Sequence, residues 1–204
     1  MRSYKFLRAG AIGPFSGFAW PRPAGGGPGP WVEANGPRAR CRRGVHACRI
    51  DDLPWWLAEE LWEVELGDEV VAYAHKVAAP RGRLVRRVDG WTAAARHDYA
   101  YDCAWRTRDR ALEALRGRAA ERLRSCTTLA AVESTARELA GDEPEARIAL
   151  VMAADGALTA VSELAATGAY IAAHAARHVA GEDAMAAERR WQATRLAERL
   201  GLSA

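Results

Sequence analysis

The sequence lacks any long apolar run. None of its uncharged stretches approaches the roughly 20 apolar residues that cross a bilayer as a helix, so we expect no membrane-spanning segment. Residues 1–20 carry basic and then apolar residues, but Gly10, Gly13, Pro14 and Gly17 interrupt the continuous apolar region that a secretion signal needs. Cysteine is also scarce, with only four in the chain. Without a sign of secretion, we expect free thiols in a cytoplasmic protein.

The later part of the chain has almost no tryptophan or proline. Beyond residue 110, only Trp191 and Pro144 occur, and the composition turns to Ala, Leu, Glu and Arg. These residues favour packed helices. We therefore expect two domains, an α+β domain at residues 1–95 and an α-helical domain at residues 96–204. The helical domain could also mediate homo-oligomer formation.

Alternating apolar and polar residues in the first domain predict short β-strands. The segment LWEVEL at residues 61–66 is compatible with a helix that ends at Gly67 or with a strand, and we favour the strand. Before it, Asp51 or Asp52 is expected to cap a short helix whose first turn holds Pro54. The predicted fold class is α+β, a small mostly antiparallel sheet with a packed helix, followed by an α-helical domain. Strands are expected at residues 3–9, 31–34, 44–50, 61–66, 70–77 and 84–88.

The second domain carries helical signals throughout its length. Asp142 precedes Pro144 as a helix cap, and Gly141, Gly156 and Gly181 lie near expected helix ends. Alanine-rich faces permit close packing, which predicts a compact bundle. Helices are expected at residues 99–123, 128–139, 144–154, 158–179 and 182–200.

Phosphate-binding motifs are missing. The glycine-rich residues 21–30 are followed neither by Gly-Lys-Ser/Thr nor by a helix, so they predict a flexible loop. Arginines at residues 38–43 and 81–87 could meet nucleic acid, particularly beside exposed aromatic rings. Asp89 and Asp98 offset part of that charge, and the net charge of the chain is only +3. We therefore do not expect nucleic acid as a partner.

Two groups of residues have the chemistry of metal ligands. His46 and Cys48 share one strand face and Cys41 lies nearby, but the C-x4-H-x-C spacing differs from zinc sites, which use four ligands and closer cysteine pairs. His174 and His178 lie one helical turn apart without the glutamate of the zinc-protease pattern. We interpret the first group as buried structural residues and the second as a polar edge or interface, and we assign no metal. Metal binding stays the alternative for each.

Glu63 and Glu65 form a third candidate group. On a strand the two carboxylates share a face, where they can raise each other's pKa and divide acid and base roles. We nevertheless favour a solvated face opposite the apolar side of the strand, and the acid and base pair is the alternative. Trp55 is a separate candidate, because on a helix it is turned about 100° away from Trp56. We expect it to dock the helical domain, and ligand binding is the alternative.

Several strings of the first domain resemble a family of actinobacterial proteins of unknown activity. These strings lie within residues 4–84 and imply kinship without a function. Near the C-terminal end, AHAARH and AERRWQATRLAERL are similar to Ala-rich helical immunity proteins through their composition. The strings that carry the first resemblance are YKFLRAG, GPFSG, GVHAC, DLPWWL, ELWEVEL and APRGRL.

The order of some residues also resembles ADP-ribosyltransferases. These enzymes present an Arg or His on an early strand and a catalytic glutamate in a Glu-x-Glu pair, similar in order to Arg8, His46 and Glu63-Val64-Glu65. The Ser-Thr-Ser triplet of that family is missing, and the gap from His46 to Glu65 is short. The resemblance implies NAD as the cofactor, Glu65 as the key carboxylate with Glu63 assisting, and Arg8 and His46 at the phosphate or ribose.

The sequence leads us to a cytoplasmic binding or regulatory protein without enzymatic activity. Residues 10–21 predict a loop that brings Phe15, Phe18 and Trp20 onto a surface, and aromatic and arginine side chains are favoured at interfaces. The partner is an unknown protein or small molecule. The alternative is an NAD- or nucleotide-using enzyme with Glu65, Glu63 and His46 as catalytic residues. Candidate binding residues are Arg8, Trp20, Trp55 and Arg83.

Overall fold

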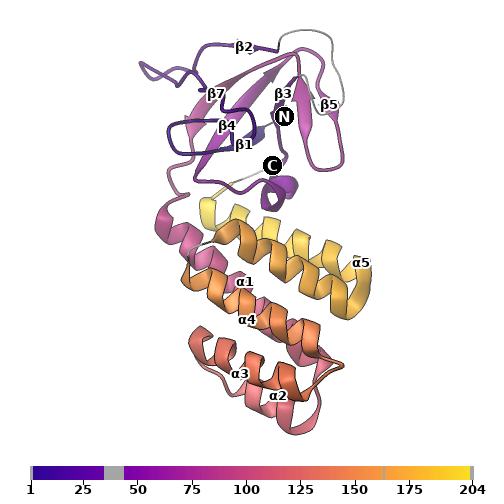
Figure 1. The fold of residues 1–204 in the computed structure, drawn as a ribbon. Coiled ribbons are helices and arrows are strands. Elements are labelled where there is room, and N and C mark those ends of the chain that lie inside the picture. The colour runs from indigo at the N-terminus through magenta and orange to yellow at the C-terminus, as the bar shows by residue number, and fades with distance from the viewer. Residues whose placement is uncertain (1, 35–43, 163, 203–204) are drawn as a thin grey trace. The chain divides into compact units, whose positions relative to one another are not determined.

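The computed structural model describes residues 2–34, 44–162 and 164–202. The chain forms two compact units, of which unit 1 comprises residues 1–92 with 193–204 and unit 2 comprises residues 93–192. Strands and turns make up most of unit 1, and helices make up unit 2 (Figure 1). The predicted α+β class is therefore confirmed. In the structure the chain leaves unit 1 after Thr92. The division into two domains at residue 95 stays a prediction.

Unit 1 contains two small antiparallel sheets. The larger has the strand order β1-β4-β7-β2, and the smaller has the order β3-β6-β5. Backbone hydrogen bonds of 2.8 and 2.7 Å between Tyr4 and Cys48 link β1 to the chain that follows β3. The strands are β1 (Ser3–Leu7), β2 (Val32–Glu33), β3 (Val45–Ala47), β4 (Glu60–Gly67), β5 (Val71–Ala72), β6 (Val77–Ala79) and β7 (Arg81–Arg87).

The core of unit 1 follows from alternation along these strands. Leu7 on β1 and Val64 on β4 are buried on the face that packs against the smaller sheet, together with Leu84 on β7. On the opposite face of β1, Phe6 meets Trp91 in an edge-to-face contact with ring centroids 5.6 Å apart. Strand β1 is therefore covered on both sides. Its polar residues Ser3 and Lys5 thus lose contact with water, which costs free energy.

The helix expected after Asp51 or Asp52 is a short 3₁₀ helix, η1 (Ile50–Trp55). Neither aspartate caps it, so the predicted cap is wrong. Asp52 is instead buried and accepts a 2.6 Å hydrogen bond from Nε of Arg49. The predicted strand at LWEVEL is confirmed as β4, while the single strand expected at 70–77 is replaced by β5, a turn and β6.

Unit 2 holds helices that differ from the expected set in their ends. The predicted helix 99–123 breaks where Gly117 adopts a φ of +53° at the start of α2. The predicted end at Gly156 is wrong, because Gly156 lies inside α4 and packs against Thr107 of α1, where an added Cβ would come within 3.2 Å. Gly181 does interrupt α5, with a φ of +82°. The helices are α1 (Ala93–Ala114), α2 (Gly117–Arg124), α3 (Leu129–Asp142), α4 (Arg147–Val161) and α5 (Ala165–Leu200).

A buried ion pair lies within the alanine-rich packing of unit 2. Glu188 is fully buried and accepts hydrogen bonds of 2.6–2.8 Å from both Nε and Nη2 of Arg106. Gln192 packs beside it and donates a 3.0 Å hydrogen bond to the carbonyl of Ala169. We expect these directional hydrogen bonds to fix how the surrounding helices align, because alanine faces alone allow several alignments.

Unit 1 is discontinuous in sequence. Residues 193–204 belong to it although unit 2 intervenes. The side chain of Leu200 lies against Gly90, where an added Cβ would be 3.4 Å from Cδ2 of Leu200. The last turns of α5 are therefore part of the packing of unit 1.

Candidate ligand cavity of unit 1

A cavity of about 780 Å³ opens within unit 1. Its size falls in the range of small-molecule sites, which are mostly apolar with a few placed polar groups. Strand β1, the loop at residues 13–20, strand β3 and the turn before β6 all contribute to its lining. Its lining residues include Lys5, Phe15, Phe18, Trp20, His46, Cys48, Trp56 and Lys76.

Lys5 reaches the cavity from the middle of β1. It lies opposite Trp62 of β4, on the same strand face as buried Leu7. Its ammonium group donates a 2.6 Å hydrogen bond to the carbonyl oxygen of His46 and lies 5.1 Å from the ring centroid of Trp20. Burial lowers the pKa of Lys5 to about 8, because leaving water disfavours the charged form.

His46 and Cys48 follow on the neighbouring segment. Burial lowers the pKa of His46, and the positive charges of Lys76 and Lys5 lower it further, so the imidazole is neutral at neutral pH. Burial raises the pKa of the Cys48 thiol to about 12, with a contribution from Asp52. The thiol of Cys48 is thus uncharged and a poor nucleophile where it lines the cavity. The neutral imidazole of His46 can accept a proton.

The aromatic loop, residues 10–20, covers one side of the cavity. Gly10 and Gly17 adopt positive φ angles of 87° and 68°, which a glycine tolerates without strain. Ala11 also has a positive φ, of 61°, a conformation that costs an alanine free energy. Buried Glu60 offsets this cost, because its two carboxylate oxygens each accept a 3.1 Å hydrogen bond from the backbone N–H groups of Gly10 and Ala11.

Glu60 is held as a carboxylate by its surroundings. Burial alone would raise its pKa, but hydrogen bonds from the indole N–H of Trp62 and the amide of Gly10, together with the charge of Arg87, lower it below the ordinary value. The Trp62 bond is 3.0 Å long. The aromatic loop is therefore anchored to β4 by an ionised group.

The aromatic rings of the loop stand at the rim of the cavity. Phe15 is 87% exposed and makes an edge-to-face contact with Trp56, with ring centroids 6.3 Å apart. Phe18 is 44% exposed and contacts Trp20 in the same way at 5.7 Å. Exposed phenylalanine is unfavourable in water unless a partner covers it. These rings provide an apolar entrance.

Arg49 positions the opposite rim. Its guanidinium group binds Asp52 and donates hydrogen bonds of 3.1 and 2.9 Å to the carbonyl oxygens of Tyr73 and Ala74. The indole N–H of Trp56 donates a 2.5 Å hydrogen bond to the carbonyl oxygen of His75 in the same turn. These hydrogen bonds hold the turn, and its next residue, Lys76, lines the cavity, with its ammonium group 5.6 Å from the ring centroid of Tyr73.

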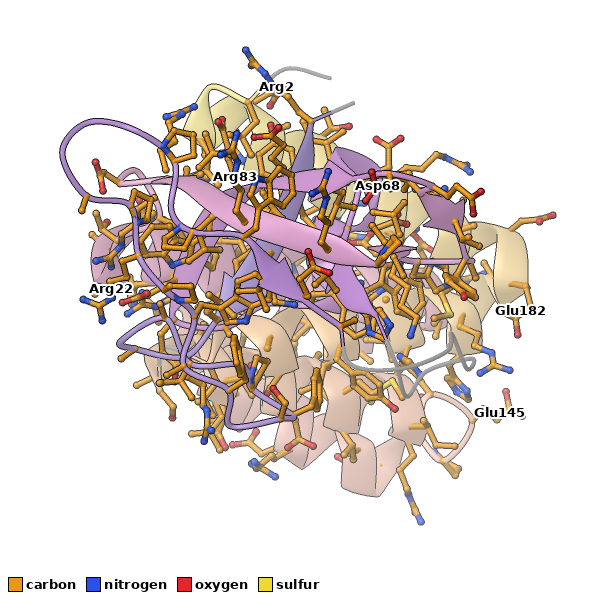
Figure 2. All side chains as sticks on the ribbon, turned by 90° about the horizontal axis from the view of Figure 1, so that it is seen from above. Arg2, Arg22, Asp68, Arg83, Glu145 and Glu182 are labelled. Carbon is orange, nitrogen blue, oxygen red and sulfur yellow. The ribbon has the colours of Figure 1, made fainter. Side chains whose placement is uncertain are left out.

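The structure brings together only some of the predicted site residues. His46 and Trp20 line the cavity, whereas Arg8, Trp55 and Arg83 are not among its lining residues. Arg8 is exposed beyond the end of β1, and Trp55 stacks on His75 with ring centroids 4.0 Å apart. Arg83 lies on β7 (Figure 2), with its guanidinium group 4.6 Å from the ring centroid of Trp31.

Glu63 and Glu65 both form ion pairs along the sheet. Nε of Arg83 donates a 2.8 Å hydrogen bond to Glu65, and Nε of Arg86 donates one of 2.9 Å to Glu63. A bulge interrupts the pairing of β4 with β7 between Glu63 and Val64. Neither carboxylate lines the cavity that holds His46. The two glutamates thus act here as partners of β7 arginines, and the structure does not bring Arg8, His46 and Glu65 into this cavity.

The described candidate metal residues do not belong to a larger group of possible ligands. Among residues 2–34, 44–162 and 164–202, no three His, Cys, Asp or Glu side chains are grouped as metal ligands. Cys41 lies outside the described residues. His174 stacks on Tyr170 with ring centroids 3.9 Å apart. In the same described ranges, no helix is both long and apolar enough to cross a membrane.

Comparison with known proteins gives no relative from which a function could be carried over. No family model matches the chain, and neither a curated protein nor a solved structure matches it. The resemblance to an actinobacterial family stays a prediction. Function must be argued from the cavity itself.

Sequence reasoning missed the two amines of the cavity. Lys5 was one polar residue of an alternating strand, and Lys76 ended another. A signal was present in the composition, since Lys5 and Lys76 are the only lysines among 29 Lys and Arg residues. Their rarity marks them, but only the fold shows that both reach one cavity.

Proposed function

We propose that unit 1 is a ligand-binding module whose cavity takes a flat, largely apolar organic anion. The observation that carries the proposal is the gathering of aromatic rings and both lysines around one cavity of about 780 Å³. The rings of Trp20 and Trp56 supply apolar area, and Lys76 supplies a positive charge at the rim. Aromatic side chains dominate binding energetics because they bury much area with few torsions to fix.

The surrounding charges favour an anion over a cation. Lys5, Lys76 and the neutral imidazole of His46 all contribute nitrogen groups to the lining, against one exposed carboxylate, Glu33. A planar anion can place its ring between the aromatic side chains and its charged group at Lys76. This proposal develops the binding role that the aromatic and basic residues of the first domain predict.

A naphthalene sulfonate tests the proposal, because it combines a flat ring system with a permanent negative charge. Isothermal titration calorimetry of the whole protein should show binding that weakens in Lys76→Gln by about fivefold, the effect of about 1 kcal/mol for a partly screened charge. Trp56→Leu should weaken binding through the loss of ring contact. Raising the salt concentration should weaken binding of the wild type more than that of Lys76→Gln.

Arg83→Gln is the matched control. It removes the same charge from unit 1, on β7, at a residue that does not line the cavity. Its affinity for naphthalene sulfonate should equal that of the wild type within twofold. If Arg83→Gln weakens binding as much as Lys76→Gln, or if the wild type releases no heat, the cavity is not the site of anion binding.

A further inference from the structure

Both lysines of the chain reach the same cavity, although arginine supplies nearly all of its 29 basic side chains. Many of the described arginines form ion pairs or bind carbonyl oxygens, such as Arg49 with Asp52. A guanidinium group remains protonated at any accessible pH, whereas a lysine amine can lose its proton and act as a nucleophile. Lysine at these two positions therefore offers a chemistry that the rest of the basic residues cannot.

Lys5 has the environment of a reactive amine. Its partners are the carbonyl oxygen of His46 and the ring of Trp20 rather than a carboxylate. Among the described residues, no carboxylate forms an ion pair with the ammonium group that would offset its partial removal from water. With the pKa of Lys5 lowered to about 8, about a quarter of the amine is neutral at pH 7.5, compared with about a thousandth for an ordinary lysine.

We propose that Lys5 is a covalent attachment point in this cavity, where its amine forms a reversible imine with the aldehyde or ketone group of a small aromatic ligand. The inference rests on the proposed function, because the ring and the anionic group of the ligand must first occupy the cavity. Desolvated lysines in apolar pockets are the ones that form Schiff bases. Lys76, at the rim, would hold the anionic group of the same ligand.

The reaction needs no oxidant or reductant. The nitrogen lone pair of Lys5 attacks the carbonyl carbon, a C–N bond forms, and a proton passes from nitrogen to the carbonyl oxygen to give a carbinolamine. The C–O bond then breaks, the oxygen leaves as water with the second amine hydrogen, and a C=N bond remains. His46 lines the same cavity with a neutral imidazole and is placed to carry these protons.

The probe is para-formylbenzoate, which carries an aldehyde, a ring and a carboxylate. The whole protein is incubated with it at pH 7.5, the imine is reduced with cyanoborohydride, and peptide mass mapping locates the adduct. We expect one adduct at Lys5, formed at least tenfold faster than at Lys76 or the N-terminal amine. The rate should saturate with probe concentration, and para-(hydroxymethyl)benzoate, which lacks the carbonyl, should compete.

Lys5→Arg is the decisive variant, because it keeps a positive charge and removes the nucleophile. It should lose the adduct while still binding naphthalene sulfonate. The pH dependence of the wild-type labelling rate at Lys5 should have a midpoint near 8. Equal labelling of all amines, or a labelling rate that rises linearly with probe concentration, would overturn the inference.

The outcomes separate this inference from the function on which it rests. If naphthalene sulfonate and para-(hydroxymethyl)benzoate bind but no adduct forms at Lys5, the cavity binds anions and the imine is refuted. If neither compound binds and Lys5 is still labelled without saturation, the proposed function fails and Lys5 is only an exposed amine. A saturable adduct at Lys5 with competition by the carbinol supports both.

Discussion

Glu60→Gln tests whether one ionised side chain holds the aromatic loop. In the wild type, one carboxylate oxygen accepts from the Gly10 amide, and the other accepts from the Ala11 amide and the Trp62 indole. A glutamine side chain has only one acceptor oxygen, and its NH₂ group must then face a donor. Leaving a buried donor without an acceptor costs about 1–3 kcal/mol, so we expect unit 1 to lose about 2–3 kcal/mol of unfolding free energy.

Urea unfolding measures this loss. Tryptophan fluorescence reports mainly on unit 1, which holds six of the eight tryptophans, Trp20 and Trp62 among them, while far-ultraviolet circular dichroism follows the helices. The fluorescence transition should move to lower urea, and the dichroism transition of the helices much less. Glu65→Gln is the control on the same strand, because Glu65 is exposed and its ion pair with Arg83 contributes less than about 1 kcal/mol. Equal stability of Glu60→Gln and Glu65→Gln would refute the anchoring role.

The same anchor predicts a dependence on acid. Because the pKa of Glu60 is lowered in the folded protein, the unfolded state binds its proton more readily. Its contribution to stability is complete above the unfolded pKa, near 4.5, and is lost as the pH falls through the lower folded value. The wild type should therefore lose stability in acid more steeply than Glu60→Gln. Parallel acid profiles of the two proteins would contradict an ionised Glu60.

Two further predictions concern unit 2 and use the same urea titrations, followed by circular dichroism. Glu188→Gln should lower the free energy of unfolding by about 2–4 kcal/mol, because it leaves the partly buried guanidinium group of Arg106 without a counter-charge. Its control, Glu182→Gln, removes an exposed ion pair and should change the free energy of unfolding by less than about 0.5 kcal/mol. Gly156→Ala should destabilise by about 1 kcal/mol, since the buried side chain of Thr107 cannot retreat, while Gly141→Ala, in open space, should gain up to about 1 kcal/mol. Stabilisation by both alanines, or equal losses from both glutamines, would contradict the packing described for unit 2.

The sequence predicted those parts of the fold that local patterns determine. Alternation in LWEVEL identified β4, because a half-buried strand has a period of two residues. Predictions from local sequence were wrong where contacts between distant residues determine the structure. Asp52 has the side chain of a helix cap, but Arg49 takes its carboxylate, and Pro54 lies in a six-residue 3₁₀ helix. Glycine is a residue type typical of helix ends, but Gly156 lies inside α4, where the missing side chain lets Thr107 of α1 pack closely.

The candidate site was only partly predictable for a related reason. Phe15 and Phe18 could be placed at a surface because glycines break the chain around them. The same expectation is wrong for Trp20, which is only 7% exposed and belongs to the core of unit 1 although it lines the cavity. The amine of Lys5 reaches the cavity only because β1 pairs with β4 on one side and with Cys48 on the other. Pairing over such sequence distances leaves no local signal. The role of Glu60 was not predicted beside the adjacent pair Glu63 and Glu65. Its backbone partner Gly10 lies fifty residues away in sequence, so no local pattern indicates the contact.

The separation of unit 1 into residues 1–92 and 193–204 has a consequence for the order of events during synthesis. On the ribosome, every residue of unit 2 emerges before Leu200, which packs against Gly90. The helices of unit 2 can thus assemble while the sheets still wait for their final segment. A released chain that ends after residue 192 should therefore carry a protease-resistant helical part, attached to a unit 1 that lacks the segment packed against Gly90 and is more sensitive to protease.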